Sequence, residues 1–140
     1  MMASTGMRLC QARAELALAR GDTHEALIAS SQVVEQSRAR HRPKYEALAL
    51  AVRAQASART ARKSAQRDAR LAADIARDIG DPGLILACLT VLIALDGTDA
   101  LVDEFRRTVR RVLGGLSLEP LKRRFLAQIG QPAAAGRTAW

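Results

Sequence analysis

The chain has 140 residues, of which 49% are hydrophobic and only 3% aromatic, and its formal net charge is +8. This length fits one domain, and the apolar fraction excludes an intrinsically disordered protein. Alanine dominates the apolar residues and no stretch alternates β-branched with polar residues, so the composition favours closely packed helices over a sheet.

The first two expected helices form a hairpin. Ser4 or Thr5 can cap a helix that runs to about Arg20. We expect one apolar face of this helix to pack inward: Leu9, Ala12, Leu16 and Ala17. Gly21-Asp22 supplies a helix stop followed by an N-cap, so a second helix is predicted from Thr23 to about Arg40.

Turn signals predict the helices that follow. Pro43 and Pro82 each suit the first turn of a helix, and Gly80 suits a helix end. The expected bounds are approximately 43–59, 62–79, 82–95, 100–113 and, for a short last helix, 119–129. The break between Arg59 and Arg62 has no glycine and is inferred from repetition alone. Residues 130–140 have the composition of a flexible tail, so we predict one domain over residues 1–129.

The sequence repeats itself at a spacing of 39 residues. Six pairs match in one register: Leu9 with Leu48, Ala12 with Ala51, Ala17 with Ala56, Ala26 with Ala65, Arg38 with Arg77, and Pro43 with Pro82. A period of this length is typical of helical solenoids. The predicted fold is therefore all-α, with about three antiparallel helical hairpins and a C-terminal helix that caps the stack.

This pattern resembles a divergent tetratricopeptide-repeat array. Gly21-Asp22 matches the usual turn, although the bulky aromatics of that repeat are absent. The small residue that opens the second helix of each repeat falls on Ala26, Ala65 and Ala100. The small residue midway along the first helix falls on Ala14, on Arg53 or Ala54, and on Cys88. The resemblance implies a right-handed α–α superhelix that binds a protein or peptide.

Longer segments resemble the C-terminal helical-repeat region of bacterial signalling ATPases and transcriptional activators of the MalT and LuxR type. They are PKYEALALAVRAQASAR, ARLAADIARDIGDPGLILA and LKRRFL. In that family the repeats contact proteins or sense effectors, whereas other domains bind nucleotide and DNA. This chain has neither a phosphate-binding loop motif nor a recognition-helix motif. The resemblance therefore implies a detached sensor region of a transcriptional regulator.

No residue pattern predicts an enzyme, a cofactor site or a metal site. His24 and His41 have no partner at metal-ligand spacing, and Cys10 and Cys88 have no nearby histidine that would favour a thiolate. Asp99 and Asp103 share one helical face, where they could serve acid–base chemistry or stabilise the helix dipole. We favour stabilisation of the helix dipole over acid–base chemistry as the role of these two carboxylates. No apolar run is long enough to span a bilayer, and a cytoplasmic protein with free thiols is expected.

Two binding surfaces are predicted. If the first helix of each hairpin lines a concave groove, that groove contains Gln11, Glu15, Leu18, Leu50, Ala54 and Ser57. The second surface is basic, because the stretch between Arg38 and Arg77 holds eleven basic and three acidic residues. Its candidates, with a second cluster near the C-terminus, are Arg59, Arg62, Lys63, Arg67, Arg70, Arg106, Arg107, Arg110 and Arg111.

These surfaces support two functional hypotheses. The leading one is a non-enzymatic regulatory scaffold that binds a protein or peptide partner. The alternative is a basic helical protein that binds nucleic acid through the surface between Arg38 and Arg77. Exposed apolar stripes at the ends of a short array also predict self-association.

Overall fold

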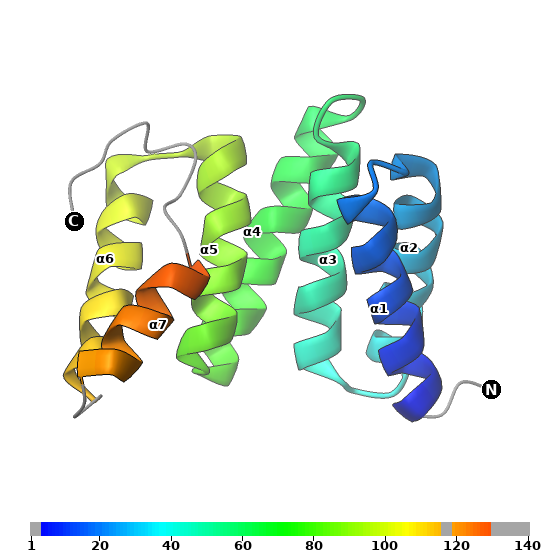
Figure 1. Ribbon diagram of the computed structural model, residues 1–140. Coiled ribbons are helices and arrows are strands. Elements are labelled where there is room, and N and C mark those ends of the chain that lie inside the picture. The colour runs from blue at the N-terminus through cyan, green and yellow to red at the C-terminus, as the bar shows by residue number, and fades with distance from the viewer. Residues whose placement is uncertain (1–3, 116–118, 130–140) are drawn as a thin grey trace.

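The computed structural model describes residues 4–115 and 119–129, which form seven α-helices and no β-strand (Figure 1). The helices are α1 (Ser4–Ala19), α2 (Thr23–Ala39), α3 (Pro43–Ser57), α4 (Arg62–Ile79), α5 (Pro82–Asp96), α6 (Asp99–Gly114) and α7 (Glu119–Ile129). The all-α prediction is confirmed for these residues. The predicted tail, residues 130–140, lies outside the described part of the chain.

Side-chain caps and left-handed residues set most helix ends. The Asp22 carboxylate accepts a hydrogen bond from the Glu25 backbone N–H, and the Thr98 hydroxyl accepts one from the Leu101 N–H. Gly21 and Gly80 adopt positive φ angles of 78° and 82° after α1 and α4. The Gly-Asp turn chemistry that predicted these boundaries is therefore present in the structure.

The turn without a glycine lies at residues 58–61, between α3 and α4. The Ser57 carbonyl accepts hydrogen bonds from the backbone N–H groups of Thr60 and Ala61, which closes the turn without a left-handed residue. The break inferred from repetition is confirmed. The third helix ends two residues earlier than expected, at Ser57 rather than Arg59.

The helices pack sequentially as antiparallel neighbours and form two layers. Each helix from α1 to α5 packs against the next one along the chain, and in addition α1 contacts α3 and α3 contacts α5. The odd-numbered helices α1, α3 and α5 therefore share one layer, in front of α2 and α4 in Figure 1. The short helix α7 crosses in front of α5 and α6 in the same view.

The size of the buried side chains changes along the core. Every buried residue of α4 is alanine: Ala65, Ala69, Ala72, Ala73 and Ala76. Helix α5 instead buries nine larger residues, among them Leu89 and Ile93, and Phe105 of α6 is almost completely buried. Small side chains allow α4 to pack close to its neighbours, whereas α5 fills the wider space around it.

The predicted inward face of α1 is wrong. Leu9 and Leu16 are 68% and 51% exposed and Ala12 is exposed, so only Ala17 of the predicted stripe is buried. The buried face of α1 carries Met7, Gln11, Ala14 and Ala17. Helix α1 has apolar residues on two adjacent faces, and only its contacts with α2 and α3 select the buried one.

One arginine–carboxylate ion pair connects each pair of consecutive helices from α1 to α5, and another connects α4 to α6. The pairs are Arg13–Glu25, Arg38–Glu46, Arg53–Asp68, Arg70–Asp96 and Arg77–Glu104. The hydrogen bonds from Arg53 and from Arg77 are bidentate, with N···O distances of 2.8 to 3.1 Å. Part of the basic charge predicted to be available for a partner therefore holds the helices in register.

Candidate functional site

Four of the six predicted groove residues lie in the interior. Gln11, Leu50, Ala54 and Ser57 are buried, so their side chains are not exposed on a groove surface in this structure. Only Glu15 is exposed and Leu18 is half-buried. The reason is geometric, because α3 packs against α1, α2, α4 and α5 and buries most of its circumference.

The exposed face of the odd-helix layer follows the 39-residue period instead. We define the odd-helix stripe as the nine residues at three equivalent positions of each odd helix: Leu9, Ala12 and Leu16 of α1, Leu48, Ala51 and Gln55 of α3, and Ala87, Thr90 and Ala94 of α5. Successive positions are three or four residues apart, so they share a helix face. Six of the nine residues are exposed, Leu48 and Thr90 are half-buried, and Ala51 is buried. None is charged.

Helix α7 lies beside Ala87 and Thr90 in the α5 part of this stripe. A pocket of about 360 Å³ between α3, α5 and α7 is lined by residues of all three helices, including Gln55, Ala87 and Thr90 of the stripe and Phe125 and Gln128 of α7. Phe125 is half-buried and packs against the main core. Phe125 and three stripe residues therefore line one common pocket.

The predicted basic residues lie around the even-numbered helices and differ in their partners. Arg70 forms an ion pair with Asp96, and Arg62 donates to the Leu95 carbonyl. Arg67 donates to the Ser64 hydroxyl, and Arg110 makes a long contact of 3.5 Å with the Arg106 carbonyl. In residues 4–115 and 119–129, five of the predicted residues form no ion pair and donate no hydrogen bond: Arg59, Lys63, Arg106, Arg107 and Arg111.

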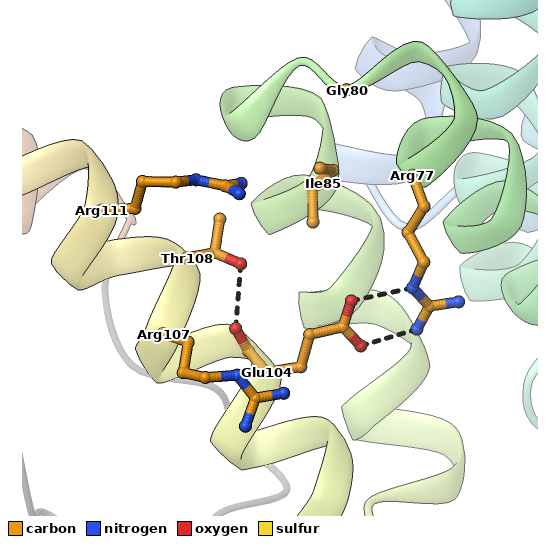
Figure 2. A pocket seen from close by; sticks show the side chains of 7 residues that line it. All are labelled: Arg77, Gly80, Ile85, Glu104, Arg107, Thr108 and Arg111. Atoms are coloured by element: carbon orange, nitrogen blue, oxygen red, sulfur yellow. Dashed lines mark hydrogen bonds and ion pairs between the residues drawn. The ribbon is translucent and has the colours of Figure 1, made fainter.

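Two of these arginines line a pocket between α4, α5 and α6. We call this space, about 460 Å³ in volume, the Arg77 pocket; its lining residues are Arg77, Gly80, Ile85, Glu104, Arg107, Thr108 and Arg111. Arg107 and Arg111 extend from α6 toward the pocket, and Arg77 enters from α4 on the opposite side (Figure 2). Buried Ile85 of α5 forms an apolar wall.

Arg77 and Glu104 fix one side of this pocket. The Nε and Nη2 atoms of Arg77 donate to Glu104 at 2.8 Å each, and its Nη1 donates to Asp74 at 2.9 Å. The hydrogen bonds from Arg77 lower the pKa of the Glu104 carboxyl, and the nearby Arg107 charge lowers it further. The same hydrogen bonds raise the pKa of Arg77. Glu104 is therefore ionised at neutral pH and orients Arg77.

Sequence reasoning missed both Arg77 as a pocket residue and the odd-helix stripe. The stripe could have been found, since Leu9 and Leu48 were matched at a spacing of 39, and Ala87 lies a further 39 residues along. The pairing of Arg77 with Glu104 joins residues 27 positions apart and depends on how α4 and α6 pack. No local pattern indicates such a pair.

The fold and these surfaces define an all-α protein of sequentially packed antiparallel helices. No protein-family model, curated protein or solved structure matches the chain. In the described residues no group of three or more histidine, cysteine, aspartate or glutamate side chains is placed to hold a metal ion. No helix of the same residues has the length and hydrophobicity needed to cross a membrane.

Proposed function

We propose that this chain is a protein-interaction module whose odd-helix stripe binds an amphipathic helix of a partner protein. In this proposal the pairs α1–α2, α3–α4 and α5–α6 act as tetratricopeptide-like repeats of a right-handed superhelix. The role is regulatory, as in the sensor regions that the sequence resembles. The observation that carries the proposal is the uncharged, largely apolar stripe at three repeated positions of the odd-numbered helices.

The composition of the stripe favours a helical partner. Leu9 and Leu16 are large apolar residues that α1 leaves exposed, whereas most of the other positions are alanine. Large exposed residues beside small ones form a surface on which another helix can pack closely. Exposed apolar patches mark sites of interaction with other proteins.

Helix α7 provides an internal example of the proposed contact. It is amphipathic, and its half-buried Phe125 lies against α3 and α5 at one end of the stripe. The α1 part of the stripe is not among the residues that line this contact. We therefore expect a partner helix to use Leu9 and Leu16 as its main contacts.

The test is a selection of helical peptides, displayed as a library, against the full chain. We expect the selected peptides to carry large apolar residues three and four positions apart and to keep their affinity at high salt. Leu16→Glu should weaken them about tenfold or more, because it places a charge in an apolar contact. The matched control is Ile28→Glu, since Ile28 is 40% exposed on α2, in the other layer.

Two results would contradict the proposal. Peptides that bind equally well to the Leu16→Glu and wild-type chains would show that the stripe is not the contact. Acidic ligands, or nucleic acid, whose affinity falls steeply with salt and collapses when Arg62, Lys63, Arg67 and Arg70 are neutralised would instead support the nucleic-acid alternative.

A further inference from the structure

The Arg77 pocket has an excess of positive charge that its own residues do not neutralise. Its lining contains three guanidinium groups and one carboxylate, a formal charge of +2. Arg77 is engaged by Glu104 and by Asp74, outside the lining. The excess therefore lies on Arg107 and Arg111.

These two arginines are placed to act together. They are four residues apart on α6, so their Cα atoms are separated by about 6 Å along the helix axis on one face. Both side chains are exposed, and neither forms an ion pair with a carboxylate in the part of the chain that the structure describes. Like charges at this spacing destabilise a helix slightly, and an anion bound between them relieves that repulsion.

The remaining walls limit the kind of anion. Ile85 offers apolar surface, and the turn at Gly80 closes one edge of the pocket (Figure 2). A volume of about 460 Å³ accommodates an anionic group with a small organic substituent. The two positive charges on Arg107 and Arg111 match a phosphate monoester, which carries close to two negative charges at neutral pH, better than they match a single carboxylate.

We propose that the Arg77 pocket binds a phosphate monoester. Arg107 and Arg111 donate hydrogen bonds to the phosphoryl oxygens, the geometry for which guanidinium groups are best suited. Arg77, held by Glu104 and Asp74, forms the opposite wall, and Ile85 contacts the organic part. The phosphate belongs either to a free small molecule or to a phosphorylated side chain of a bound protein. This site is separate from the odd-helix stripe.

Titration of the full chain with phenyl phosphate, followed by calorimetry and by NMR of the arginine Nε–H signals, tests the proposal. We expect saturable binding at millimolar or lower concentrations, with shifts of the Arg107 and Arg111 signals. The double variant Arg107→Gln/Arg111→Gln should bind at least about tenfold more weakly. The control is Arg106→Gln/Arg110→Gln, which removes the same charge at the same spacing on α6 but does not line the pocket. It should stay within about twofold of wild type.

Further ligands test whether the charge of the ligand determines its affinity, and whether the phosphate belongs to a small molecule or to a phosphorylated protein. Benzoate, with one negative charge, should bind more weakly than phenyl phosphate. Tighter binding of a short phosphoserine peptide than of free phosphoserine would assign the site to a phosphorylated side chain, and the reverse order would assign it to a small molecule. Equal losses in the two double variants, or no saturation by phenyl phosphate, would overturn the proposal. Unchanged far-UV circular dichroism of both variants excludes misfolding as the cause.

Discussion

The fully buried residues of α4 are all alanine, and this predicts that both a larger and a smaller residue at Ala69 destabilise the protein. Ala69 is completely buried and belongs to the main core between α3 and α5. If the helices are close-packed there, a larger and a smaller residue should both destabilise the protein. A loosely packed layer would respond differently, because a larger apolar side chain would fill free space and raise the free energy of unfolding.

The expected magnitudes follow from the buried position. Ala69→Gly loses one buried methyl group and adds the helix-propensity cost of glycine, which together lower the free energy of unfolding by about 2 kcal/mol. Ala69→Leu overpacks the same space and should also cost about 2 kcal/mol. In a layer with free space, the added methylene groups would instead stabilise the protein by about 2 kcal/mol.

Urea unfolding monitored by far-UV circular dichroism measures these changes. We expect both variants to unfold at lower urea concentration with an unchanged slope, and their melting temperatures to fall by about 8 °C. Ala94→Leu is the control, because Ala94 is exposed on α5 and its substitution should change stability by less than about 0.5 kcal/mol. A higher midpoint for Ala69→Leu than for wild type would refute the close packing of α4.

Three further predictions address the turns, the ion pairs and the thiols. Gly80→Ala should cost about 1 kcal/mol in a thermal melt, from the backbone alone, because φ is 82° and the added Cβ meets no atom within 4 Å; no loss would contradict the left-handed turn. Arg77→Gln should cost less than about 1 kcal/mol at neutral pH, since the pair is partly exposed. The pKa of Glu104 is lowered in the folded state, so the ion pair with Arg77 stabilises the protein at neutral pH and this stabilisation is lost as the pH falls through that pKa. A stability difference between wild type and Arg77→Gln that persists in acid would contradict this role of the ion pair. Burial raises the pKa of Cys88 to about 11, so a thiol reagent should modify half-buried Cys10 first and reach Cys88 only on unfolding, which mass spectrometry after timed labelling can follow.

The sequence was most informative about helix ends. Gly21-Asp22, Pro43 and Gly80 act locally, through backbone angles and caps, and the structure places helix boundaries at each of them. The end of α3 was misplaced by two residues because residues 58–61 form a turn from ordinary helix-forming residues. Such a turn is visible only through the repeat.

Side-chain orientation was less predictable. Leu9 and Leu16 on one face of α1 compete with Met7 and Ala14 on another, and both sets have helical spacing. Which set is buried depends on the neighbouring helices rather than on α1 itself. The choice between Arg53 and Ala54 at the middle repeat was open for the same reason. In the structure Ala54 is completely buried, whereas Arg53 reaches across to Asp68.

Packing between near neighbours along the chain has a kinetic consequence. Within residues 4–115 each helix packs mainly against helices one or two places away, so the native topology needs few closures of long loops. Chains with such local contacts fold within microseconds to milliseconds, and their units can form or open one after another. The large side chains of α5 would anchor the last unit to open, and hydrogen exchange should proceed from both termini toward it.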